Sequence, residues 1–193
     1  MDKQPTDIHG KFYNRNLLVL VLIIGSFCTV LNGTLLATAL PSIMRSFHIS
    51  TATAEWLSTA FLLVNGVMIP ISAWLINRFG SRKMYLSAMS VFFIGTVIAA
   101  IAPNFGTLLA GRIIQGLGVG VTMPLLQTIM LSIFPANKRG AAMGTVGIVI
   151  GLAPAIGPTL SGWIVDNLSW RYLFSIIAPI AGVVIILAFF LIK

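Results

Sequence analysis

The sequence predicts an all-α integral membrane protein, folded as a bundle of six transmembrane helices that consists of two inverted three-helix repeats. Three observations support this fold class. Hydrophobic residues make up 58% of the 193 residues and charged residues only 8%, whereas about a quarter of the residues of a soluble domain are charged. Six charge-free runs each exceed the ~20 residues that a helix needs to cross a bilayer. A short pattern that closes one helix also returns, three helices later, at the end of another.

Each charge-free run is expected to form one helix. After a polar cytoplasmic tail at residues 1–16, the helices are expected at approximately residues 17–40, 56–76, 84–102, 106–132, 141–164 and 172–192, so that residues 17–193 form the bundle. The first run follows basic residues and could be read as a signal peptide, but it is too long for an ordinary h-region and has the length of a full span.

The remaining helices are separated by charges or by turn residues. Arg112 alone interrupts the long run that begins at Met84, so a turn at Pro103 and Asn104 is expected to separate the third and fourth helices. The other helices are separated by loops with basic residues, and the distribution of these residues predicts the orientation of the chain in the membrane. Nine basic residues fall in the loops on the amino-terminal side, while the opposite loops hold only Arg45 and Arg171. The positive-inside rule therefore predicts that both termini are cytoplasmic.

The net charge of +8 does not indicate nucleic-acid binding. The basic residues lie singly or in short clusters between apolar runs, which is the distribution of topology determinants rather than of a nucleic-acid surface. No nucleic-acid partner is expected, and the lipid bilayer is the predicted environment.

The repeat is visible where the second and fifth helices end. The segment Ala73–Arg82 reads AWLINRFGSR, and the segment Gly162–Arg171 reads GWIVDNLSWR. Both follow the order small, Trp, two aliphatic residues, Asx, any residue, apolar, small, any residue, Arg. Three helices separate the copies, so they face opposite sides of the membrane, as in the inverted repeats of many secondary transporters.

The stretch Gly140–Trp163 combines the length of a span with a high content of glycine and proline. Small residues at every third or fourth position let another helix approach closely, and proline bends a helix. We therefore expect a close and bendable packing surface at Gly147, Gly151, Pro154, Gly157 and Pro158. Gly116, Gly118 and Gly120 are interpreted in the same way, because no strand precedes them as in a phosphate-binding loop.

Arg112 is the one formal charge expected within the helices. A buried arginine is costly and needs partners. Gln115 lies on the same helical face, and Asn32 of the first helix is expected at a similar depth. These residues are candidates for a substrate cavity or coupling site, but Arg112 could equally clamp the first helix to the fourth by bonding backbone carbonyls.

Two further polar residues are candidates for the same site. Glu55 opens the second helix and is either an interfacial carboxylate near a helix N-terminus or a titrating partner of Arg112. Gln127 could line a cavity or bond a neighbouring helix.

Catalysis and metal binding have little support in the sequence. His9 and His48 both fall outside the expected helices, and neither a G-x-S-x-G motif nor a pair of intramembrane carboxylates is present. The single cysteine, Cys28, has no partner for an internal disulfide. An enzyme is therefore not expected, nor a metal site.

Four motifs resemble those of the major facilitator superfamily, in its fourteen-helix drug:proton antiporter branch. They are LNGTLLATALP at residues 31–41, AWLINRFGSRK at 73–83, LLAGRIIQGLGVG at 108–120 and GIVIGLAPAIGPTLSG at 147–162. Their order and spacing correspond to the amino-terminal six-helix half of such a transporter. The resemblance implies a multidrug exporter in a bacterial-type plasma membrane, which works by alternating access and uses a proton gradient rather than a bound cofactor.

The sequence departs from the family pattern at functional positions. The first motif usually carries an aspartate where this chain has Asn32, and an amide cannot titrate near physiological pH. In the loop motif, Asn77 replaces an aspartate and Ser81 a basic residue, which weakens the charge relay of the family. A cytoplasmic gate at Asn77, Arg78, Gly80, Arg82 and Lys83 is still implied. Ser161 stands at a usual glycine.

The resemblance further implies that the chain is one half of a larger protein. Its expected partners are a missing carboxy-terminal helical bundle and hydrophobic or amphipathic small molecules. Two alternatives remain: a non-transporting assembly or regulatory half, and a uniporter or symporter of a small solute, for which the helices offer few polar groups.

Overall fold

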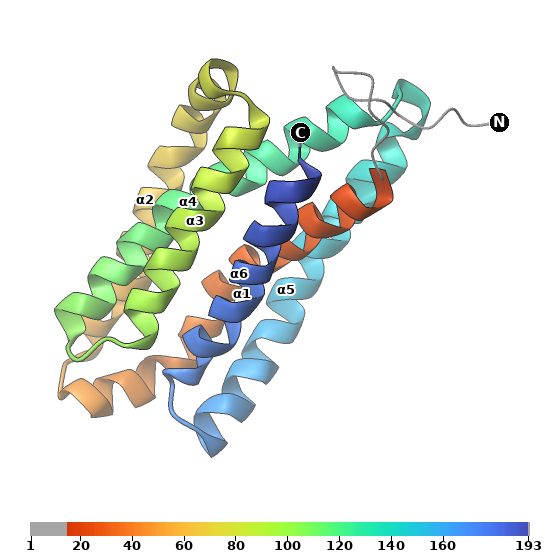
Figure 1. The fold of residues 1–193 in the computed structure, drawn as a ribbon. Coiled ribbons are helices and arrows are strands. Elements are labelled where there is room, and N and C mark those ends of the chain that lie inside the picture. Colours follow the sequence, from red (N-terminus) through yellow and green to blue (C-terminus); the bar gives the residue numbers. More distant parts are fainter. Residues whose placement is uncertain (1–14, 193) are drawn as a thin grey trace.

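The computed structural model describes residues 15–192; residues 1–14 of the expected tail at 1–16, and Lys193, lie outside them, and α1 begins at Arg15. The described chain forms six α-helices and one short 3₁₀ helix, with no strand (Figure 1). All six α-helices are long and apolar enough to cross a membrane. The predicted fold class is therefore confirmed. The helices are α1 (Arg15–Phe47), α2 (Thr51–Phe79), α3 (Ser81–Ala100), α4 (Phe105–Ile133), α5 (Arg139–Asn167) and α6 (Tyr172–Leu191), with η1 (Ala136–Lys138) between α4 and α5.

Capping residues, rather than charged residues, mark where α2 and α4 begin. The hydroxyl oxygen of Ser50 accepts a hydrogen bond from the amide of Thr53 at 3.3 Å, so α2 begins before Glu55. Asn104 caps α4 in the same way, with a 2.9 Å bond from the amide of Thr107. These are ordinary N-cap bonds. The expected turn at Pro103 and Asn104 is present, and Gly80, with a φ of 80°, forms the turn between α2 and α3.

The helix contacts follow the predicted inverted repeat. In the first half α1, α2 and α3 correspond to α4, α5 and α6 of the second half. The packing of α1 on α5 matches that of α4 on α2, and the packing of α3 on α4 matches that of α6 on α1. The self-symmetric pairs α1–α4 and α3–α6 are also in contact. Helices α2 and α5 lie at opposite sides of the bundle (Figure 1).

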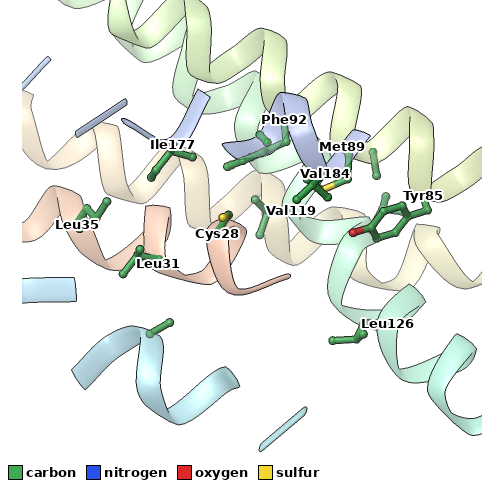
Figure 2. Packing of buried hydrophobic residues seen from close by; sticks show 14 of the residues in the cluster. Cys28, Leu31, Leu35, Tyr85, Met89, Phe92, Val119, Leu126, Ile177 and Val184 are labelled. Carbon is green, nitrogen blue, oxygen red and sulfur yellow. The ribbon is translucent and has the colours of Figure 1, made fainter. Parts of the chain in front are cut away.

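The apolar core lies mainly between α1, α3, α4 and α6. Figure 2 shows Cys28 of α1 on the side of this core that holds Met89 and Phe92 of α3, Val119 of α4, and Ile177 and Val184 of α6, whereas Leu31 points toward α5. By contrast, α2 and α5 bury few side chains. Large apolar residues are exposed along both, among them Leu62, Leu63, Val67 and Trp74 of α2 and Ile148, Leu152, Ile156 and Trp163 of α5.

Glycines bring α4 close to the helices on either side. A Cβ atom on Gly118 would lie 2.5 Å from the carbonyl oxygen of Ala88 in α3. On the opposite side of α4, a Cβ on Gly116 would lie 2.9 Å from the carbonyl oxygen of Phe61 in α2. Both distances are shorter than any ordinary Cβ contact. The interpretation of these glycines as packing positions therefore agrees with the structure.

The glycines of α5 behave differently from one another. Gly157 is buried, and a Cβ there would clash with Thr34 of α1. A Cβ on Gly147 or Gly151 would meet nothing within 4 Å, and Pro154 and Pro158 are exposed. Within the described chain, α1 is thus packed against only one of the five expected packing positions. The reason is rotational: α5 turns a different stripe, with Val146, Val149 and Ala153, toward its neighbours.

Candidate functional site

The candidate site is a buried polar cluster of residues from three helices, which a fourth helix, α2, also contacts. Arg112 and Gln115 come from α4, Asn32 from α1 and Thr96 from α3. Arg112, Gln115 and Thr96 are 0% exposed and Asn32 is 1% exposed. The structure therefore brings together three of the five residues that the sequence predicted for this site, and adds Thr96.

Gln115 connects the members of the cluster. Its side-chain oxygen accepts a hydrogen bond from a terminal nitrogen of Arg112 at 2.9 Å. Its side-chain nitrogen donates to Thr96 Oγ1 at 2.9 Å and to Asn32 Oδ1 at 3.4 Å. Since Arg112 fixes the oxygen of the Gln115 amide, the nitrogen must face Thr96 and Asn32. Gln115 thus links Arg112 to α1 and α3.

The charge of Arg112 is compensated without a carboxylate in the described chain. Its Nε donates to the carbonyl oxygen of Leu57 in α2 at 3.3 Å. Its guanidinium carbon lies 4.0 Å from the ring centroid of Phe61, also in α2. An aromatic face attracts a desolvated cation by about 2 kcal/mol or more. The arginine therefore clamps α4 to α2 through a backbone carbonyl, whereas the clamp considered from the sequence joined α4 to α1.

Asn32 keeps one buried donor without a partner. Its Oδ1 accepts from Gln115, but its Nδ2 has no hydrogen-bond partner in the described chain. An unsatisfied buried donor costs about 1–3 kcal/mol. The unpartnered donor is therefore a cost that an acceptor-only side chain at this position would not carry.

The close approach of α3 and α4 places Thr96 within reach. A Cβ atom on Gly95 would lie 2.7 Å from the backbone nitrogen of Gln115. Sequence reasoning missed Thr96, Leu57 and Phe61. The only signal for Thr96 is a hydroxyl next to a glycine in an apolar run, and the Leu57 carbonyl has no sequence signal at all.

Two other predicted site residues lie apart from the cluster. Glu55 is exposed in the second turn of α2, and the printed partners of Arg112 do not include it. This placement agrees with an interfacial carboxylate rather than with a partner of Arg112. Gln127 is exposed on α4, several turns beyond Gln115.

The loop motif between α2 and α3 contains two arginines with different contacts. Arg78 is exposed and lies over the rings of Trp74 and Phe79, at 5.3 and 5.9 Å from their centroids. Arg82 instead bonds the carbonyl oxygen of Phe189 in α6 at 3.0 Å. The other members expected in the gate, Asn77, Gly80 and Lys83, are exposed at the same end of the bundle.

The described residues offer no metal centre. No group of three or more His, Cys, Asp or Glu side chains lies close enough together between residues 15 and 192 to hold a metal ion. His9 lies outside the described residues, and His48 is exposed in the turn after α1.

Relatives of the chain are membrane transporters. Residues 22–193 match the Major Facilitator Superfamily. The uncharacterized MFS-type transporter YcnB of Bacillus subtilis (strain 168) is 55% identical over 188 residues, which cover 97% of this chain and 40% of YcnB. The lincomycin resistance protein LmrB of the same organism is 42% identical over 162 residues, 84% of this chain and 34% of LmrB. The multidrug export protein EmrB of Haemophilus influenzae is 35% identical over 172 residues, 89% of this chain and 34% of EmrB.

Solved structures show the same fold. A crystal structure of a D-xylose-proton symporter has a TM-score of 0.73 at 20% sequence identity, over 90% of this chain and 47% of that one. The proton:xylose symporter XylE bound to 6-bromo-6-deoxy-D-glucose has a TM-score of 0.78 at 20% identity, over 91% and 44% of the two chains. The 193 residues thus span less than half the length of these relatives and of the solved structures. The fold, the six spans and the match over residues 22–193 together establish that the chain belongs to the major facilitator superfamily.

Proposed function

We propose that the chain forms the amino-terminal half of a proton-coupled multidrug exporter that works by alternating access. The observation that carries this proposal is the level of similarity to named exporters. LmrB is 42% identical and EmrB 35% identical, each over more than four fifths of the chain. The xylose symporters share the fold at 20% identity, so they do not favour sugar symport.

The proposed orientation places the basic loops in the cytoplasm. The α2–α3 turn, the α4–α5 connection and the end of α6 lie at the same end of the bundle (Figure 1). This end includes Arg78, Arg82, Lys83, Lys138 and Arg139. The described acidic residues, Glu55 and Asp166, belong to the opposite end. The positive-inside rule assigns the basic end to the cytoplasm.

The proposed partner is a second helical bundle beyond residue 193. The exposed apolar faces of α2 and α5, with Gly147 and Gly151 open for a close approach, suit another helix layer better than an anchoring role alone. Hydrophobic or amphipathic molecules would bind between the two bundles. In this proposal Arg112, Gln115 and Asn32 hold α1, α2, α3 and α4 in the arrangement that the cavity requires.

The proposed coupling carboxylate lies outside this half. The candidate cluster contains amides, a hydroxyl and a guanidinium group, but no carboxylate. We therefore expect that Glu55→Gln in the full-length transporter leaves pH-driven drug uptake into inverted vesicles intact. Loss of that uptake with drug binding preserved would assign the proton site to Glu55 instead.

The function is tested with a variant at Arg112 in the full-length transporter. Drug accumulation is compared in cells that express no transporter, the wild type, Arg112→Ala or Arg45→Ala, where Arg45 is an exposed control at the end of α1. We expect the wild type and the control to lower accumulation, and Arg112→Ala to lose export while it still inserts in the membrane. Wild-type protein without any export of a panel of amphipathic drugs would favour the assembly or regulatory alternative, and full export by Arg112→Ala would remove the role of the cluster.

A further inference from the structure

Arg82 connects the beginning of α3 with the end of α6. It is the second residue of α3, and a terminal nitrogen of its guanidinium donates to the carbonyl oxygen of Phe189 at 3.0 Å. Phe189 lies in the last turn of α6, where carbonyl groups lack partners within the helix and the helix dipole is negative. The guanidinium carbon also lies 5.6 Å from the centroid of the Phe189 ring. We call this contact the Arg82 cap.

Arg171 makes the same type of connection at the other end of the two helices. It directly precedes α6, and a terminal nitrogen donates to the carbonyl oxygen of Ala102 at 2.9 Å, just beyond the last residue of α3. Its guanidinium carbon lies 4.4 Å from the ring centroid of Trp170. We call this contact the Arg171 cap. Each arginine thus stands at the start of one helix, bonds a carbonyl at the end of the other, and lies over an aromatic ring.

The two caps are related by the inverted repeat. Arg82 and Arg171 are the final residues of the two copies of the closing pattern, Ala73–Arg82 and Gly162–Arg171. Helix α3 belongs to the first repeat and α6 to the second, and the two helices pack on each other. The caps therefore join the two repeats at both ends of this helix pair.

The two caps differ in how firmly they are held. Trp170, the ring of the Arg171 cap, is 1% exposed, donates from Nε1 to Ser46 Oγ at 3.2 Å, and makes edge contacts with the rings of Phe47 and Phe174. This cap is thus also tied to α1. Phe189, the ring of the Arg82 cap, is 55% exposed. Electrostatic and cation–π contacts are worth more where water is excluded.

We propose that Arg82 and Arg171 are paired positioning residues that fasten the two ends of α3 and α6, so that the two three-helix repeats move as one body, with the Arg171 end as the firmer attachment. The proposal goes beyond the proposed export function, because it concerns the motion of the half-bundle whatever its substrate. Loss of one cap releases one end of the helix pair and leaves the other end fastened.

The test measures the spacing of α3 and α6 separately at each end. Spin labels at Ser87 and Leu187 report on the Arg82 end, and labels at Ile94 and Ile176 report on the Arg171 end; all four positions are exposed. Cys28, the single cysteine of these 193 residues, is first replaced by alanine, together with any cysteine in the rest of the transporter. Distance distributions are recorded in the full-length transporter in lipid for Arg82→Gln and Arg171→Gln. Arg139→Gln and Arg45→Gln serve as controls, because Arg139 bonds only the preceding turn and Arg45 is exposed at the end of α1.

We expect each cap variant to widen the distance distribution at its own end only, and the controls to widen neither. The widening should be larger for Arg171→Gln, which should also lower the melting temperature more than Arg82→Gln. If Arg171→Gln does not fold, Arg171→Lys, which keeps the charge but loses the planar stacking, replaces it with the same expectation. Equal widening at both ends would mean a general loss of stability, and no widening beyond the controls would mean that packing alone holds the helices; either result overturns the proposal. Because no drug is present, the result does not depend on whether the transporter exports drugs.

Discussion

Substituting alanine for Gly118 tests the backbone packing of α4 against α3. The added Cβ would lie 2.5 Å from the carbonyl oxygen of Ala88, 2.8 Å from the backbone nitrogen of Phe92 and 2.9 Å from its Cβ. Two of these three atoms belong to the backbone, so no side-chain rotation relieves the clash. Ordinary contact begins at 3.4 Å, and α3 must therefore shift away from α4 by close to an ångström.

The expected loss of stability combines two opposing contributions. Alanine gains about 0.8–1.0 kcal/mol over glycine in helix propensity. Overpacking costs typically about 1–3 kcal/mol, and the upper part of that range applies because backbone has to move. The movement also strains the 2.9 Å bond between Gln115 and Thr96, which crosses the same helix pair. We expect a net destabilisation of about 1–2 kcal/mol.

The assay is thermal unfolding of the purified chain in detergent, followed by tryptophan fluorescence, with Gly147→Ala as the matched control. A Cβ on Gly147 meets nothing within 4 Å, so this variant keeps only the gain in helix propensity and should melt at or slightly above the wild-type temperature. Gly118→Ala should melt several degrees lower. If both variants melt at the same temperature, α3 and α4 are not in backbone contact at Gly118 and the reasoning fails.

Three further variants test the polar contacts. Gln115→Leu removes the acceptor of Arg112 and the donor to Thr96. We expect a destabilisation of about 1.5–3 kcal/mol, which is the value of a hydrogen bond to a charged group. A melting temperature equal to that of the wild type would contradict this expectation. Asn32→Asp removes the unpartnered amide donor and places a carboxylate beside Gln115, which bonds Arg112. The melting temperature should rise at neutral pH and lose this gain in acid, whereas a fall at neutral pH would mean that the desolvation cost of the carboxylate dominates. Ser161→Ala removes the 2.6 Å bond from Ser161 Oγ to the carbonyl oxygen of Leu35 and the contact with Thr38. The expected cost is about 0.6–1.7 kcal/mol. The control is Ser175→Ala, whose hydroxyl bonds the carbonyl of Arg171 one turn earlier in the chain. An equal effect of both variants would show that the link between α1 and α5 is not stabilising.

The sequence alone predicted the six membrane spans and three of the four residues of the buried cluster. Charge-free runs predict membrane helices because the hydrocarbon sets a minimum length. Arg112 had to find polar partners, and its spacing from Gln115 together with the depth of Asn32 indicated two of them. The structure confirms that these three residues meet.

The remaining contacts depend on how each helix is rotated about its axis. Thr96 and Phe61 contact the cluster only because α3 and α2 turn these positions toward α4. Rotation is set by packing against neighbours, and several apolar faces of a membrane helix look alike in sequence. For the same reason Gly157 packs against α1, while Gly147 and Gly151, which were expected on the same packing surface, lie on another face of α5. Ser161, interpreted only as a small residue, in fact bonds the backbone of α1.

The order of the helices along the chain has a consequence for its synthesis. Helix α1 packs mainly against α5 and α6, whereas α4 packs against α2 and α3, which precede it (Figure 1). Helices α2, α3 and α4 can therefore associate as soon as α4 has entered the membrane, but α1 waits until α5 and α6 have been synthesised before its main partners exist. During that interval Asn32, Ser26 and Thr29 of α1 lack part of their surroundings, and a chaperone or insertase that shields this helix would protect the most exposed intermediate of assembly.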